Sequence, residues 1–173
     1  MAITASDIKF YLSGGASNSV ADSSLGGVIS SVEVVDNSLH NLFDKTLGTE
    51  STAGDIEYRC IYVKNTHASL ELELSKIWIS TNTTTPSDII TIALAGEGQD
   101  VTAETIANEN TAPSGETFTN PTTYSGGLSL DDGGTGLPAG STHAVWIKRT
   151  VAAGQVAVDN VTFILSVQGD TAA

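Results

Sequence analysis

The chain has 173 residues, a length at which one domain buries roughly 70% of the surface of its unfolded chain, so a conventional core is expected. Its 20 acidic and seven basic residues give a formal net charge of −13, which repels nucleic-acid phosphates and anionic lipid surfaces. We therefore expect no nucleic-acid partner and no membrane partner. The single cysteine, Cys60, excludes an intrachain disulfide and favours a small, buried side chain.

The N-terminal part of the chain predicts one short strand followed by irregular structure. Apolar residues alternate with polar ones from Ile8 to Leu12, as in a half-buried strand. Segment 13–27 is almost entirely Ser, Asn, Ala and Gly, and we expect a flexible arm or loop that becomes ordered against a neighbour. Residues 36–43 place Leu39, Leu42 and Phe43 at helical spacing behind a polar cap, which predicts a short helix, whereas 48–54 is expected to be a turn-rich break.

Residues 57–80 predict two amphipathic strands joined by a polar turn at 65–69. In the first strand, Tyr58, Cys60 and Tyr62 share one face, and Arg59, Ile61 and Val63 lie on the other. In the second strand, Leu70, Leu72 and Leu74 form the dry face, and Glu71, Glu73 and Ser75 the wet one. The apolar residues then change from even to odd positions at Ser75–Lys76, as one extra residue would cause, so a bulge or bend is predicted there.

The rest of the chain predicts further strands separated by long loops. Residues 90–94 alternate again, and segment 96–127 is poor in large aliphatic residues, which indicates a long interaction loop. The C-terminal block, 142–169, is as strand-like as 57–80. Seven to eight strands without a βαβ rhythm predict an all-β fold in one domain, 1–173: an antiparallel β-sandwich, jelly-roll-like or immunoglobulin-like, with long loops and an N-terminal arm.

No pattern of catalytic, cofactor-binding or metal-ligating residues is found, so we expect no enzyme and assign no site residue of these kinds. The histidines, His40, His67 and His143, have no metal-ligand spacing. The acidic loop 131–136 lacks the register of a calcium loop, and an acidic turn explains it better. Trp78 and Trp146 are candidates for sugar-stacking platforms, but packing in the core or at a subunit interface is the favoured interpretation.

Several stretches resemble small structural proteins of tailed bacteriophages, notably SDIKFYLSGGASN, EYRCIYVKNT, KIWIST and LPAGSTHAVWIKRTVAAGQVAVDNVTFILSVQGDT. The resemblance implies a virion protein: a cement or decoration protein on the outside of an HK97-type capsid, which stabilises the shell by bridging capsomers. It further implies the major capsid protein as partner, self-association as a dimer or trimer, and synthesis in the host bacterial cytoplasm. The acidic composition suits a capsid exterior better than a surface that faces DNA.

Two other functions remain open at this point. A head-tail connector or minor tail protein also uses β-sandwich domains with long loops. A carbohydrate-binding adhesion module would use the two tryptophans as stacking platforms for sugar rings.

Overall fold

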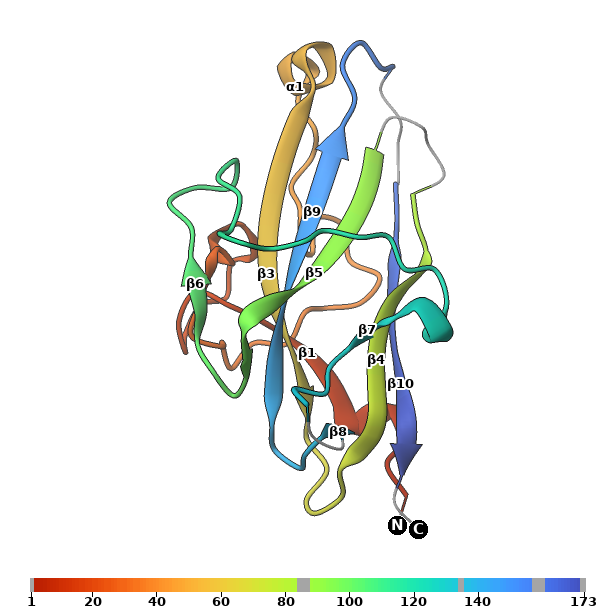
Figure 1. The fold of residues 1–173 in the computed structure, drawn as a ribbon. Coiled ribbons are helices and arrows are strands. Elements are labelled where there is room, and N and C mark those ends of the chain that lie inside the picture. The colour runs from red at the N-terminus through yellow and green to blue at the C-terminus, as the bar shows by residue number, and fades with distance from the viewer. Residues whose placement is uncertain (1, 84–87, 134–135, 157–160, 172–173) are drawn as a thin grey trace.

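Two antiparallel sheets form the body of the protein, as the alternation of apolar residues predicts (Figure 1). The computed structural model describes residues 2–83, 88–133, 136–156 and 161–171. The larger sheet has the order β1-β3-β9-β5, formed by Ile8–Leu12, Asp55–Asn65, Thr142–Val151 and Asp88–Gln99. The smaller sheet has the order β10-β4-β7, formed by Ile164–Thr171, Leu72–Thr81 and Leu128–Ser129, and β8 (Gly136–Leu137) also pairs with β4. The fold is therefore an all-β antiparallel sandwich.

The aliphatic core lies between the two sheets. On the larger sheet it includes Ile61 and Val63 of β3 and Val145 and Ile147 of β9, which are at most 2% exposed. The smaller sheet contributes Ile77 and Ile79 of β4, and further members are Ile90, Ile92, Leu130 and Leu137. Each fully buried aliphatic side chain of this size stabilises the fold by about 1.5 to 3 kcal/mol relative to an exposed one.

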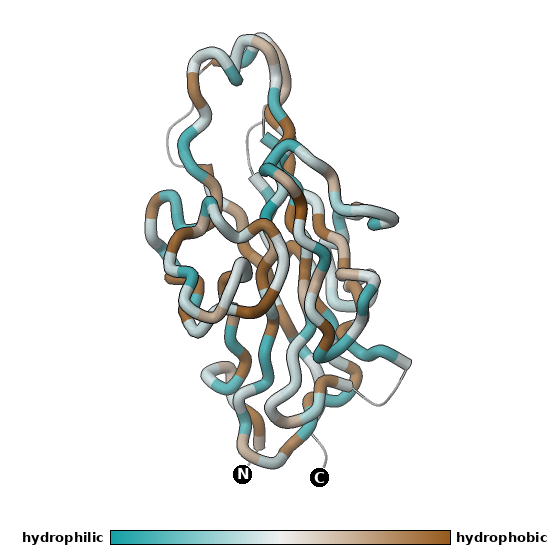
Figure 2. The backbone as a smooth tube through the Cα atoms, turned by 90° about the vertical axis from the view of Figure 1, so that its left-hand side faces the viewer, coloured by the Kyte–Doolittle hydropathy of each residue, from teal (hydrophilic) through white to brown (hydrophobic). Residues whose placement is uncertain are grey.

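The opposite, outer face of the larger sheet is also buried. It carries Tyr58, Cys60 and Tyr62 of β3 beside Ala144 and Trp146 of β9. Two segments, 13–31 and 96–118, cover this face, and together we call them the loop cover. The loop cover lies to the left of β3 in Figure 1 and faces the viewer in Figure 2. The chain therefore forms three layers, and the larger sheet is the middle one.

A short sheet and several backbone hydrogen bonds hold the loop cover in place. Its two segments pair with each other through β2 (Gly26–Gly27) and β6 (Ala103–Thr105). The upper half of β3, which extends beyond its pairing with β1, bonds to both segments: Cys60 N–H donates to Ser24 O at 2.8 Å, and Tyr58 N–H donates to Glu109 O at 2.7 Å. Segment 13–27 is thus a loop that lies against its own sheet, and it includes the 3-10 turn η2 (Ala21–Ser23).

Segment 96–127 crosses from one sheet to the other. It begins with the end of β5, passes through β6, and closes with the 3-10 turn η3 (Tyr124–Gly126). Between them, Thr119 and Ile92 of β5 exchange backbone hydrogen bonds of 2.8 and 2.9 Å, and Ile79 N–H of β4 donates to Pro121 O at 2.8 Å. The segment therefore links the two sheets along one side of the sandwich.

The predicted bulge is present, but one residue earlier than Ser75–Lys76, at Leu74 and Ser75. Glu73 pairs with Asp170 and Lys76 with Gln168, so two residues of β4 lie opposite one residue of β10. Leu74 has a positive φ of 50° and is 59% exposed, while Ser75 is fully buried. The expectation that Leu74 belongs to the dry face and Ser75 to the wet face is therefore wrong, because the bulge already rotates the chain at Leu74.

The one α-helix among the described residues lies elsewhere than predicted. Residues 36–43 form turns, because Asn37 and His40 have positive φ values of 55° and 58°, which a right-handed helix does not allow. Of the three residues at helical spacing, Leu42 and Phe43 are buried but Leu39 is 72% exposed. The helix α1 is instead Gly48–Ala53, within the expected turn-rich break, and Glu50 bonds the backbone N–H of Leu47 at its start. A further 3-10 turn, η1 (Ala5–Asp7), precedes β1.

Within the described part of the chain, no helix has the length and apolar character that crossing a membrane requires.

Candidate functional site

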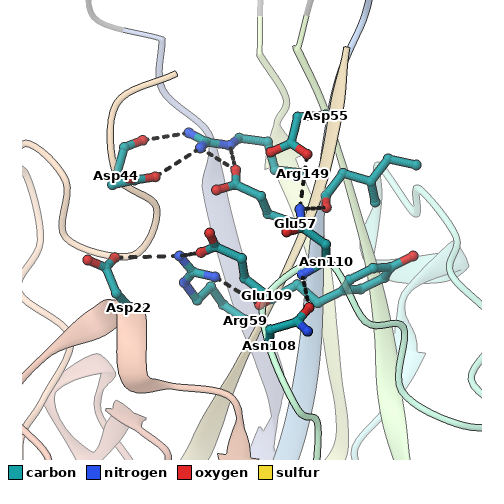
Figure 3. Close-up of polar contacts among 11 residues, drawn as sticks. Asp22, Asp44, Asp55, Glu57, Arg59, Asn108, Glu109, Asn110 and Arg149 are labelled. Atoms are coloured by element: carbon teal, nitrogen blue, oxygen red, sulfur yellow. Dashed lines mark hydrogen bonds and ion pairs between the residues drawn. The ribbon is translucent and has the colours of Figure 1, made fainter. Parts of the chain in front are cut away.

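Two buried arginines, on the neighbouring strands β3 and β9, organise a polar region of the interior (Figure 3). Arg59 of β3 and Arg149 of β9 are 0% and 8% exposed. Four carboxylates surround them, from four parts of the chain. We call this set the charge cluster; it comprises Asp22, Asp44, Glu57, Arg59, Glu109 and Arg149.

Arg149 connects the sheet to the segment that precedes α1. Its guanidinium is paired with Glu57 on the neighbouring strand, and it donates to the carbonyl oxygen of Asp44 at 2.8 Å. The ring of Phe43 lies 4.9 Å from the guanidinium carbon. Burial raises the pKa of Glu57 to about 7, although the positive charge of Arg149 acts in the opposite direction.

Arg59 connects the sheet to both segments of the loop cover. One terminal nitrogen lies 2.5 Å from a carboxylate oxygen of Glu109 and 3.5 Å from one of Asp22. Next to it, the Asn110 amide donates to Asp55 Oδ1 at 3.0 Å and to Ile56 O at 2.9 Å. Buried guanidinium groups need such partners, because an unpaired buried charge is strongly destabilising. The charge cluster is therefore an anchor for loops.

Sequence reasoning missed the charge cluster, but a signal for it was present. Arg59 shares a strand face with Ile61 and Val63, and Arg149 shares one with Val145 and Ile147. An arginine on a dry face predicts a buried partner carboxylate. Asp22, Asp44 and Glu109 lie in irregular segments, so sequence spacing does not identify them as those partners.

The histidines and the cysteine have separate structural surroundings. His143 is 4% exposed, and burial lowers its pKa. The Nδ1 atom of His67 accepts hydrogen bonds from the backbone N–H groups of Ser69 and Leu70 at 3.2 and 2.9 Å, which orders the turn after β3. Cys60 is fully buried under the loop cover, as predicted, and burial raises the pKa of its thiol. Among the described residues, no three His, Cys, Asp or Glu side chains form a group that could hold a metal ion.

The two tryptophans differ in their surroundings. Trp146 is 0% exposed beneath the loop cover, so the favoured interpretation, core packing, is confirmed for it and the sugar-stacking role is excluded. Trp78 is half-buried on the outer face of the smaller sheet, edge-on to Tyr124 with ring centroids 5.9 Å apart. Lys76 lies 5.4 Å from the centre of the Tyr124 ring. Trp78 therefore belongs to a small aromatic surface.

A group of exposed aliphatic residues lies at the end of the molecule that carries α1. We call it the apical patch; its members, 40% to 83% exposed, are Leu47, Ile56, Ile89 and Val156. Ile56 and Ile89 are both register partners of Thr150, so they form one row across three strands. A shallow hollow beside Ile56 is lined by Gly54, Asn110 and Thr150, among others. Of the four members, Ile56 lines the hollow and Ile89 lies in the same row. Neighbouring exposed aliphatic residues of this kind are typical of an interaction surface.

The second open surface is the edge of the smaller sheet at β10. This strand is the terminal strand of the smaller sheet and pairs with β4 on one side only. Within the described residues, no other segment forms a backbone hydrogen bond with Ile164–Thr171. The strand has one charged residue, Asp170, and no lysine or proline, the residues that commonly protect edge strands.

A comparison of the chain with known protein families, curated proteins and solved structures finds no match.

Proposed function

We propose that the chain is a structural protein of a bacteriophage virion, a cement or decoration protein that stabilises the outside of the capsid by bridging neighbouring capsomers. A bridging protein needs a rigid body with at least two separate contact surfaces. The observation that carries the proposal is the presence of two such surfaces, the apical patch and the open edge of β10, on one three-layered body.

The rigidity of the body supports a mechanical role. The aliphatic core joins the two sheets, and the charge cluster and the β2–β6 pairing fix the loops. A protein that binds only the assembled shell stabilises it by mass action, and several weak contacts made at once reach high avidity. The net charge of −13 keeps the protein away from packaged DNA and favours a basic partner surface.

The first experiment measures copy number and particle stability. In purified virions of the phage that encodes the chain, a cement protein is expected at an abundance near that of the major capsid protein. A head-tail connector or minor tail protein would be rarer by an order of magnitude or more. Particles stripped of the protein are expected to release DNA at a lower temperature than intact ones, and adding the purified protein back should restore the intact value. Equal stability of stripped and intact particles would contradict the proposal.

A pair of matched variants tests the contact surface. Ile89→Thr removes an exposed aliphatic side chain from the apical patch but retains a β-branched residue in β5. Val101→Thr makes the same kind of change at a residue of similar exposure, 47% against 48%, in the turn between β5 and β6. We expect only Ile89→Thr to weaken binding to stripped particles. Equal binding of both variants would remove the apical patch from the interface.

A carbohydrate-binding module is the second candidate, supported by the partly exposed Trp78 next to Tyr124. Binding to a glycan array that is lost in Trp78→Ala, with an unchanged circular dichroism spectrum, would favour this function. Trp146→Ala no longer tests it, because Trp146 is fully buried.

A further inference from the structure

We propose that β10 is a self-association edge, along which two copies of the chain pair antiparallel about a twofold axis at Val167. The smaller sheets of the two copies would then form one continuous sheet. This inference is tested on the isolated protein. In the bridging role proposed above, β10 would then act by joining two copies, each of which retains its apical patch.

The hydrogen bonds of β4 show which backbone N–H and C=O groups of β10 point away from the sheet. Ile79 of β4 donates its N–H to Pro121 O, and Ser75 accepts from Leu130 N–H, so odd-numbered residues of β4 direct their backbone groups away from β10. Leu165 and Val167 are the register partners of Ile79 and Ile77, and they therefore form non-hydrogen-bonded pairs with β4. Their N–H and C=O groups point outward, away from the sheet. By alternation, those of Gly169 do so too.

These outward groups are self-complementary. In an antiparallel ladder, directly opposed residues of a hydrogen-bonded pair exchange both N–H···O bonds. Val167 of one copy opposite Val167 of the other forms such a pair, and Leu165 opposite Gly169 forms the next one on either side. This register satisfies the outward backbone groups of all three residues in both copies.

The side chains of β10 are also compatible with the register that places Val167 opposite Val167. Val167 and Leu165 pack against the aliphatic core, so the inner side of the new ladder would be apolar and glycine would leave room for Leu165. On the outer side, Ser166 lies opposite Gln168, and Ile164, which is 53% exposed, lies opposite Asp170. The only charge of the strand thus meets no like charge.

The margin of the core next to β10 also favours an added strand. Ile8 and Phe10 of β1, like Leu165 and Val167, are only partly buried where they pack against the core. A strand added to β10 would extend the smaller sheet and exclude water from its inner side. Each cross-strand pair of this kind contributes about 0.2 to 1 kcal/mol.

Two partners could pair with the β10 edge, a second copy of the chain or a basic segment of another protein, and charge distinguishes them. The edge itself has one carboxylate, so it offers little attraction for a basic strand. Two copies with a net charge of −13 repel each other at long range, and salt screens that repulsion. The dimer should therefore become tighter as salt concentration rises, whereas binding of a basic segment would become weaker.

Sedimentation velocity of the purified wild-type chain over a range of protein and salt concentrations tests the proposal. We expect a monomer–dimer equilibrium that shifts toward dimer with added salt. Val167→Pro removes an outward N–H, which an edge strand tolerates, and should weaken the dimer by about 100-fold through the lost bonds. Val167→Ala shortens the same side chain but retains the N–H, and should weaken the dimer less than about tenfold.

Hydrogen exchange of the wild-type protein provides a readout that does not depend on the folding of a variant. The amides of Leu165 and Val167 should exchange more slowly as protein concentration rises, whereas those of Ser166 and Gln168, bonded within the sheet, should not change. A monomer at all concentrations, a trimer, a dimer unaffected by Val167→Pro in a folded variant, or exchange independent of concentration would each overturn the proposal. A monomeric protein that still binds stripped particles would leave the proposed function intact.

Discussion

Both faces of the larger sheet are buried over much of their length, but by different means. The inner face is aliphatic and packs against a second sheet through side chains such as Ile61 and Ile147. The side chains of the outer face are either aromatic or small, and Trp146 and Tyr62 are the largest of them. Irregular loops cover this face. Along the part of β3 that β1 does not reach, hydrogen bonds to loop backbone replace strand pairing.

This difference shows how loops made of small and polar residues can cover the apolar face of a sheet. Segment 13–27 offers Leu25 as its largest side chain, yet it shields a sheet face, because its backbone bonds to β3 and glycines allow close approach. Large side chains on the sheet compensate for small ones in the loops. The loop cover is therefore part of the fold. Of the four comparisons of variants that follow, three test the loop cover and one tests the inner face.

The largest effect is expected for neighbouring residues of β9 that point to opposite faces. Trp146→Ala should lower the free energy of unfolding by about 3 to 5 kcal/mol and Ile147→Ala by about 2 to 5 kcal/mol, since both side chains are 0% exposed. Urea denaturation followed by circular dichroism measures both. Hydrogen exchange should show that Trp146→Ala exposes residues 13–31 and 96–118 more than Ile147→Ala does. A cost of less than 1 kcal/mol for Trp146→Ala would mean that the loop cover contributes little to the fold.

The second comparison concerns pH and the inner face. Burial raises the pKa of Glu57 from 4.5 to about 7, so between these pH values the folded protein retains a proton that the unfolded chain releases. The free energy of unfolding should therefore fall as pH rises from about 4.5 to 7, by on the order of 3 kcal/mol from this group. Glu57→Gln cannot titrate and should show a flatter profile in this window. Identical pH profiles of the two proteins would contradict this assignment.

The third comparison tests the close approach of the two segments of the loop cover. Gly26 has a φ of +89°, and a Cβ there would collide with the carbonyl oxygen of Glu104, so Gly26→Ala should destabilise the fold by about 2 to 3 kcal/mol. Gly15 also has a positive φ, but nothing lies near its Cβ position. Gly15→Ala should cost only about 1 kcal/mol. Equal losses in thermal unfolding would show that backbone strain alone, and not the contact, matters.

The smallest effect is expected for a single hydroxyl group. Tyr62 donates to Gly27 O at 2.6 Å and accepts from Ala103 N–H at 3.0 Å, so it joins the two segments of the loop cover. Tyr62→Phe should cost about 1 to 2 kcal/mol, because both buried backbone groups lose a partner. Tyr58→Phe is the control, since the Tyr58 hydroxyl makes no hydrogen bond to any described residue. A larger loss in Tyr58→Phe than in Tyr62→Phe would contradict this role.

Strand periodicity was enough to predict the sandwich and its bulge. Alternation in 57–65 and 142–151 places each side chain on one of two faces. The bulge followed from a change of parity, which only an extra residue explains. Its site was displaced by one residue, because Leu74 is apolar but exposed, and hydrophobicity alone cannot show a positive φ.

Long-range contacts set the limit of sequence-based prediction. Helical spacing at Leu39, Leu42 and Phe43 is real, but Leu42 and Phe43 are buried by tertiary packing and by the guanidinium groups beneath Phe43. The segments that cover the sheet have no periodicity of their own, so their docking is invisible in the sequence. The open edge of β10 was equally hidden, because it depends on the order of strands in the sheet.

Cys60, the only cysteine of the chain, makes the movement of the loop cover measurable in time. Its thiol is fully buried under the loops, and its N–H is bonded to Ser24 O within them. Alkylation requires an exposed thiolate. A thiol reagent can therefore react only when the loop cover dissociates from the sheet or when the whole chain unfolds. If the reaction is faster than global unfolding, the loops open independently of the sheets, and the natural sequence already contains the probe that records their rate.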